Sequence, residues 1–282
     1  MNVDRTSVVV VSTVRSPVIR SSLLCIILLL VPLRSPGDVA SSIQSGDAAF
    51  ARMDYAEAMR EYKKGLGDTA EAPLLWRISR LYVLLSEVSV EPETSTLLDS
   101  ALVYARASIR VDSTDAGGYT WLAGALGYRA LTADMPERLI LSVELLAALD
   151  RALLLQPRND VALSITGSFY RALGNVGWIQ RQLGELLFGD VPDGGYTEAE
   201  DALLRAVAIA PDVMRHRYEL AVLYLDMERD EEAKRELLRA STLPVRIASD
   251  RPRLLKIAEL LQEHFAISVA VMGAEGGQGG AR

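Results

Sequence analysis

The chain is poor in the residues on which disulfide, metal and nucleophile chemistry depend. Its 282 residues include one cysteine, Cys25, and two histidines, His216 and His264. Because Cys25 lies in the N-terminal segment, the rest of the chain has no thiol for disulfide or thiolate chemistry. A zinc site needs clustered ligands at short spacing, and the two histidines are far apart and have no cysteine nearby. We therefore expect no catalytic, cofactor or metal site, and we expect both histidines at the surface.

Aromatic residues and positive charge are also scarce. Phe, Trp and Tyr make up 6% of the chain, and the formal net charge at pH 7 is −7. Non-specific nucleic-acid binding needs a basic surface, so this acidic balance argues against a nucleic-acid partner. Hydrophobic residues make up 50% of the chain, and alanine and leucine supply most of them. This composition suits closely packed helices better than sheets.

Residues 1–40 have the pattern of an export signal. Arg15 and Arg20 precede an apolar run over residues 23–33, and small residues follow at 40–42. The run is shorter than the roughly 20 apolar residues that span a bilayer. We interpret the segment as a signal peptide, with an uncleaved N-terminal membrane anchor as the alternative. The protein is then expected to be exported (periplasmic, envelope-associated or secreted) and to meet a membrane only through this segment.

Small and large residues alternate at helical spacing over residues 195–243. Ala199, Leu203 and Ala206 share one face of a helix that ends before Pro211. A small residue lets a neighbouring helix approach, and a large one fills the space one turn along. The same spacing recurs in residues 58–65. This is the tetratricopeptide pattern, in which a helical hairpin repeats about every 34 residues.

The repeats predict an all-α fold. We expect six tetratricopeptide-like hairpins to form an α-solenoid over residues 41–265, with a C-terminal capping helix near residues 253–261. Residues 266–282 form an expected flexible, Gly-rich tail. Residues 173–192 break the alternation, because the helix expected over residues 178–188 fits as the second helix of the fourth repeat or the first helix of the fifth. The sequence leaves that pairing open.

Several residues have predicted places within these helices. Pro136 is expected in the first turn of a helix, where a missing N–H is tolerated. Trp76 and Trp121 are expected to pack in the core. The charged run over residues 228–236 alternates in sign, which indicates a solvated helix face with modest ion pairs.

Residues 178–211 resemble a particular family of repeat proteins. Trp178 and Arg181 precede Phe188 and Gly189, and Pro192 and Tyr196 introduce the alanine-spaced helix that ends at Pro211. In these features the chain resembles the regulator of microtubule dynamics family and its bacterial relatives, over residues 43–262. The resemblance implies a helical repeat domain that acts as an adaptor or tether. One animal branch is associated with membrane contact sites and lipid binding, and others with microtubules. Because we expect an export signal at residues 1–40, we do not expect a microtubule role.

We expect a non-enzymatic scaffold or adaptor of the cell envelope that binds a peptide or protein partner on the concave face of the array. The alternative is a carrier or tether for lipid or another small apolar ligand, with an internal groove near Trp178. The candidate groove residues are arginines on two first helices and a cluster at the irregular junction, where tryptophan and arginine would concentrate binding energy. These residues are Arg129, Arg171, Asn175, Trp178 and Arg181.

Overall fold

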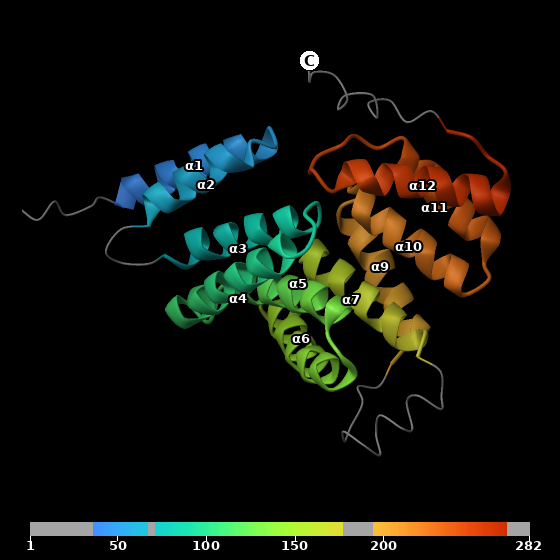
Figure 1. Cartoon of the computed structure of the whole chain (residues 1–282), viewed down its shortest axis with the longest axis horizontal. Coiled ribbons are helices and arrows are strands. Elements are labelled where there is room, and N and C mark those ends of the chain that lie inside the picture. Colours follow the sequence, from blue (N-terminus) through green and yellow to red (C-terminus); the bar gives the residue numbers. More distant parts are fainter. Residues whose placement is uncertain (1–35, 67–70, 177–193, 270–282) are drawn as a thin grey trace, which may run out of the picture. The chain divides into compact units, whose positions relative to one another are not determined.

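The computed structural model describes residues 36–66, 71–176 and 194–269 (Figure 1). The chain divides into two compact units, Met1–Arg34 and Ser35–Arg282, and all described residues belong to the second. The expected signal segment and Gly-rich tail therefore fall mostly outside the described residues. Helix α1 begins at Pro36, inside the segment expected to end at residue 40.

The described residues form helices and no strands. The helices are α1 (Pro36–Ala51), α2 (Tyr55–Gly65), α3 (Ala72–Ser86), α4 (Glu93–Val111), α5 (Ala116–Thr132), α6 (Met135–Leu155), α7 (Asp160–Gly174), α9 (Tyr196–Ile209), α10 (Met214–Asp226), α11 (Asp230–Ser241) and α12 (Asp250–Phe265). Among these residues no helix is both long and apolar enough to span a bilayer.

The helices pack as successive hairpins in two layers. The first helices of the hairpins form the first layer, and the second helices form the other. The hairpins are α1 with α2, α3 with α4, α5 with α6, α7 with α9, and α10 with α11. Successive first helices contact one another from α1 to α12, and each second helix contacts the first helix that follows it. This arrangement confirms the predicted all-α solenoid of tetratricopeptide-like hairpins with a closing helix (Figure 1).

The predicted count of six hairpins is wrong for the part of the chain that the structure describes. Those residues form five hairpins, and α12 closes the array. Helix α9 packs back on α7 as its second helix, so the next hairpin begins with α10 rather than with α9. The segment 177–193, for which the sequence left two pairings open, lies outside the described residues.

Local sequence explains where several helices begin. Asp54, Asp134 and Asn159 each precede a helix and accept a hydrogen bond from the backbone N–H three residues on, at 3.0 Å. These bonds satisfy donors that a helix N-terminus leaves free. Pro136 lies in the first turn of α6, which confirms its predicted place.

Small residues let the paired helices approach closely. A Cβ atom added at Gly46 would lie 2.2 Å from the Tyr62 ring, and one added at Gly167 would lie 2.3 Å from Leu203 Cγ. Trp121 is buried among Val83, Ala101 and Ala125, as predicted for a core tryptophan. The spacing of small and large residues in the sequence therefore corresponds to helix–helix contacts.

Candidate functional site

A buried ion network joins three first-layer helices that are distant in the sequence. Glu87 follows α3 directly, Arg215 lies on α10 and Arg253 lies on α12. The Glu87 carboxylate accepts a hydrogen bond from Arg215 Nη2, and its Oε2 lies 3.5 Å from Arg253 Nη2. The exposed fractions of the Glu87, Arg215 and Arg253 side chains are 4%, 13% and 10%. We call these three residues the inner ion network.

The network keeps its carboxylate ionised. Burial alone raises the pKa of Glu87, but the Arg215 guanidinium and the more distant Arg253 more than offset this, and hold the pKa below its ordinary value. Tyr128 accepts a hydrogen bond from Arg215 Nη2 at 3.4 Å, and burial raises the pKa of its phenol. The network therefore holds α3, α10 and α12 together, and its carboxylate is already paired with arginine.

The structure brings together two of the five predicted groove residues. Arg171 Nη1 and Asn175 Nδ2 both donate to Asp226 Oδ2, at 3.0 and 2.9 Å. Arg171 Nη2 also lies 3.7 Å from Glu219 Oε2, and Tyr196 donates to Asn175. These contacts tie α7 to α9 and α10, so the arginine already has carboxylate partners within its own chain.

The other predicted groove residues are not part of this group. Arg129 donates to Asp99 Oδ1 at 3.1 Å, and its Nε lies 3.8 Å from Glu137 Oε1. Trp178 and Arg181 lie outside the described residues. The described part of the predicted groove therefore consists of two separate sets of intramolecular ion pairs, one around Arg129 and one around Arg171.

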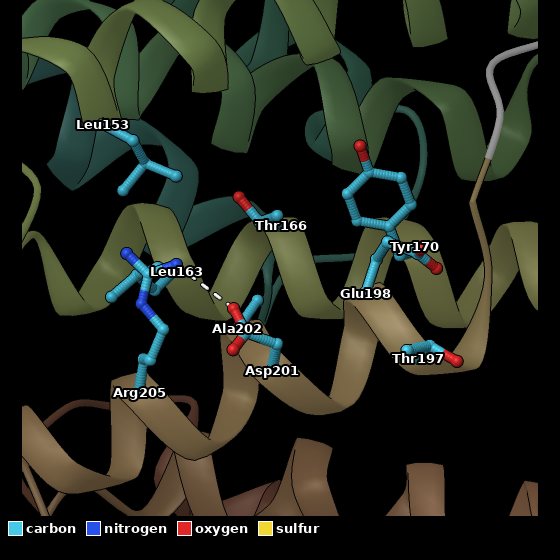
Figure 2. Close-up of a pocket in the computed structure, with 9 residues that line it drawn as sticks. All are labelled: Leu153, Leu163, Thr166, Tyr170, Thr197, Glu198, Asp201, Ala202 and Arg205. Carbon is cyan, nitrogen blue, oxygen red and sulfur yellow. Dashed lines mark hydrogen bonds and ion pairs between the residues drawn. The ribbon is translucent and has the colours of Figure 1, made fainter.

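A cleft of about 380 Å³ lies between α6, α7 and α9 (Figure 2). Helices α6 and α9 are the second helices on either side of α7, and the cleft opens between them. One residue comes from α6, three from α7 and five from α9, and they are Leu153, Leu163, Thr166, Tyr170, Thr197, Glu198, Asp201, Ala202 and Arg205. The volume lies at the lower end of the range that is typical of ligand sites.

The cleft combines an apolar floor with a mainly acidic rim. Leu163 and Ala202 are buried below it, at 0% and 3% exposure. On the rim, Arg205 Nη1 donates to Asp201 Oδ2 at 3.2 Å, and Figure 2 shows this pair at one end. Glu198 accepts a hydrogen bond from Gly195 N at 2.8 Å, which also caps α9.

Nearby carboxylates affect Tyr170 at the other end of the cleft. Its pKa is raised by burial, and further by the carboxylates of Asp150 and Glu198. Two of the nine lining residues are carboxylates, Glu198 and Asp201, and Arg205 is the one cation among them; Asp150 of α6 is not a lining residue but acts on the Tyr170 phenol. Such a site favours a cationic group with an aliphatic stem, because the stem can lie on the apolar floor while the charge stays at the rim.

One of the two histidine predictions is wrong. His264 is exposed, as expected, but His216 is buried at 1% exposure. Its Nε2 lies 2.9 Å from Asp160 Oδ2, so α10 is bonded to the start of α7. Among the described residues, no group of three or more His, Cys, Asp or Glu side chains is placed to hold a metal ion.

Comparison with known proteins extends this description. The family model for the regulator of microtubule dynamics proteins 1-3 matches residues 42–265. Regulator of microtubule dynamics protein 1 of Bos taurus is 23% identical over 213 residues, which cover 73% of this chain and 65% of the relative. The Caenorhabditis elegans protein of the same name is 22% identical over 223 residues, which cover 79% of this chain and 99% of the relative. The chain thus spans just under two thirds of the bovine protein.

The fold also has a counterpart among solved structures. A thermophilic TPR protein of Thermus thermophilus superposes with a TM-score of 0.57 at 21% sequence identity. The match covers 78% of this chain and 98% of that protein. At this level of identity the similarity establishes a shared fold and nothing narrower.

Proposed function

Because the chain belongs to the regulator of microtubule dynamics protein 1-3 family, we propose that it is a non-enzymatic scaffold that binds a protein partner. The observation that carries the proposal is the cleft between α6, α7 and α9, set in a tetratricopeptide-like array. Repeat arrays of this kind are extended binding surfaces, and a cleft with convergent polar groups is the default place for a ligand. The scaffold role also agrees with the adaptor function that the resemblance implies.

The partner segment is basic and apolar. The cleft floor takes an aliphatic or aromatic side chain, and the rim carboxylates of Glu198 and Asp201, together with the field of Asp150 outside the lining, attract a lysine or arginine beside it. The Tyr170 ring supplies an aromatic surface of the kind on which a cation can lie. Because the rim charges are exposed, added salt should weaken the interaction.

The first-layer groove around Arg129 and Arg171 stays a prediction. A partner there would have to compete with Asp99, Asp226 and Glu219 for arginines that are already paired. A partner in the cleft would compete with only one ion pair, the exposed pair between Asp201 and Arg205. We therefore place the contact site in the cleft rather than on the first helices.

We also propose that the scaffold works outside the cytoplasm, in the cell envelope or secreted. The support for this is the apolar run over residues 23–33, with basic residues before it and small residues after it. Cell fractionation, followed by sequencing of the N-terminus of the recovered protein, tests it. Recovery of the intact chain from the cytoplasm would contradict this part of the proposal.

Affinity capture from the source cells tests the scaffold role. The bait is the full chain, compared with an Asp150→Lys/Asp201→Lys cleft variant and with a Glu231→Lys/Glu263→Lys control of equal charge change. The control residues are exposed carboxylates on α11 and α12. Mass spectrometry of both protein and lipid should find one protein in fixed proportion with the wild-type and control baits, and at least about tenfold less with the cleft variant.

The same experiment separates the other possibilities. Stoichiometric lipid without a protein would favour the carrier instead of the scaffold. Equal recovery of the protein with the cleft variant would exclude the cleft as the contact site. An Arg129→Ala/Arg171→Ala bait then tests the first-layer groove, and the cleft proposal expects this bait to keep its partner.

A further inference from the structure

Helix α6 exposes an apolar stripe that is interrupted once, at the charged Asp150 and Arg151. Ile140, Val143 and Leu154 are 70%, 52% and 71% exposed, although each is a large hydrophobic residue. Together with the exposed Pro136 and Ala147, they recur every three or four residues, except for one two-turn step between residues 147 and 154. Residues at this spacing share one face of a helix. The opposite face of α6 carries the buried residues Leu145, Leu149 and Ala152, and α6 packs on α5 and α7.

Other large hydrophobic residues are exposed on α4, α5 and α6. Leu131 near the end of α5 and Met135 at the start of α6 are 72% and 53% exposed. Val103 of α4 is 62% exposed. It lies one turn before Arg106, whose Nη2 bonds to Glu144 of α6 at 2.9 Å. Single exposed hydrophobic residues need no explanation, but several on one face of a helix mark an interaction surface.

Two charges beside the stripe, Glu137 and Arg151, are complementary to those of a second copy of the same helix, whereas Glu144 between them has its counter-charge in Arg106 of its own chain. Glu137 and Arg151 lie on the same side of the stripe, near opposite ends of α6. Their contacts within the chain are long: Glu137 Oε1 lies 3.8 Å from Arg129 Nε, and Arg151 Nη2 lies 3.5 Å from Ser113 O. If two copies pair antiparallel, Glu137 of each copy comes opposite Arg151 of the other.

We propose that the exposed face of α6 is a self-association surface, on which two copies of this chain pair antiparallel about a two-fold axis near Glu144. The register that pairs Glu137 with Arg151 of the second copy also places Ile140 beside the small Ala147, and Pro136 beside Leu154. One surface is then complementary to itself, which is the requirement for a two-fold dimer. This inference does not depend on the proposed role of the cleft.

The dimer should be weak and reversible. From Pro136 to Leu154 the stripe is about 27 Å long, because an α-helix rises about 1.5 Å per residue. A contact between two single helices of this length is small by comparison with stable interfaces, which bury about 1,200–2,000 Å² in total. We therefore expect a monomer–dimer equilibrium that depends on protein concentration.

Sedimentation velocity of the full chain over a concentration series tests the proposal. The wild type should shift from monomer to dimer, and Ile140→Glu should raise the midpoint concentration at least about tenfold, because the change enters the interface twice. Leu255→Glu is the matched control: Leu255 is 45% exposed on α12, away from the stripe, and its variant should dimerise as the wild type does. Circular dichroism confirms that each variant keeps its helices.

A charge exchange tests the register. Glu137→Arg and Arg151→Glu should each weaken the dimer a few-fold, because each change places like charges opposite each other. The double variant should recover the wild-type midpoint to within about twofold. A wild-type chain that stays monomeric at every concentration would overturn the proposal, and so would an Ile140→Glu variant that dimerises as the wild type does. Failure of the double variant to recover would overturn the antiparallel register.

Discussion

Glu87→Gln should destabilise the protein far more than a single surface substitution. The carboxylate faces two guanidinium groups, those of Arg215 and Arg253, and only 4% of its side chain is exposed. Glutamine keeps the shape but removes the charge. Arg215, which is 13% exposed, then remains buried without this counter-charge, whereas Arg253 keeps its 2.7 Å pair with Asp250.

The magnitude follows from the geometry. At a separation of about 4 Å and an effective dielectric constant of about 20, one ion pair contributes about 4 kcal/mol before desolvation is counted. Removal of one partner from a buried pair typically costs about 3–5 kcal/mol, because the remaining charge is left uncompensated. We expect a loss of about 3 kcal/mol in the free energy of unfolding, since the glutamine amide keeps an oxygen that can accept from Arg215. For a domain of this size, such a loss lowers the Tm by about 6–12 °C.

Urea unfolding followed by circular dichroism measures the effect. Glu144→Gln is the matched control, because Glu144 and Arg106 also join two helices but are 39% and 46% exposed. A pair this exposed contributes less than about 1 kcal/mol. If Glu87→Gln lies within about 1 kcal/mol of the wild type, or matches the control, the inner ion network does not stabilise the fold.

The pH dependence of the same variant gives a second test. The pKa of Glu87 is lower in the folded chain than its ordinary value of 4.5, so the unfolded chain binds more protons in this range. The stabilisation by Glu87 is therefore complete above about pH 4.5 and is lost as the pH falls through the folded pKa. The difference between wild type and Glu87→Gln should shrink on acidification, and a constant difference from neutral to acid pH would contradict the assignment.

Five further substitutions, grouped into three predictions, test the packing and the remaining ion pairs. Gly167→Ala should lower the free energy of unfolding by about 1–3 kcal/mol, because its Cβ would lie 2.3 Å from Leu203 Cγ. Gly124→Ala is the control: its Cβ would lie 3.7 Å from the nearest atom, so it should raise the free energy of unfolding by about 0.5–1 kcal/mol. Thermal unfolding measures both. Asp160→Asn should lower the free energy of unfolding by about 1–2 kcal/mol at pH 7. Burial raises the pKa of Asp160 but the bond from His216 lowers it below 3.8, so this loss should fade in acid; a loss that persists there would contradict the assigned charge. Arg171→Ala should lower the free energy of unfolding more than Arg129→Ala does. The carboxylate partners of Arg171, Asp226 and Glu219, are 24% and 17% exposed, whereas those of Arg129, Asp99 and Glu137, are 65% and 51% exposed. The reverse order would contradict this ranking.

The repeat fold could be predicted from the sequence because its determinants are local. Ala199, Leu203 and Ala206 recur at the helical period, and Pro136 and the capping residues mark where helices begin. Each of these signals lies within one or two turns of the helix that it specifies. The number of hairpins could not be predicted in the same way, because the pairing of α9 with α7 is a tertiary contact across the segment 177–193.

The contacts of the candidate site could not be predicted from local sequence patterns. Glu87 and Arg215 are 128 residues apart, and Asp160 and His216 are 56 residues apart. No local pattern links such pairs, so His216 was expected at the surface although it is buried. Glu236, in the charged run expected to be solvated, is likewise buried, and it pairs with Arg217 at 2.7 Å. The cleft also depends on how three helices meet, which residue spacing along one helix does not reveal.

Site-specific photo-crosslinking in the source cells tests most directly whether the cleft binds a protein. A photoreactive residue replaces Thr197 on the cleft rim in one variant and Leu255 on α12 in the other. Our account predicts a single protein adduct from position 197, none from position 255, and loss of the first adduct when Asp150→Lys/Asp201→Lys is added. Equal adducts from both positions, or an adduct from position 197 that contains lipid and no protein, would contradict it.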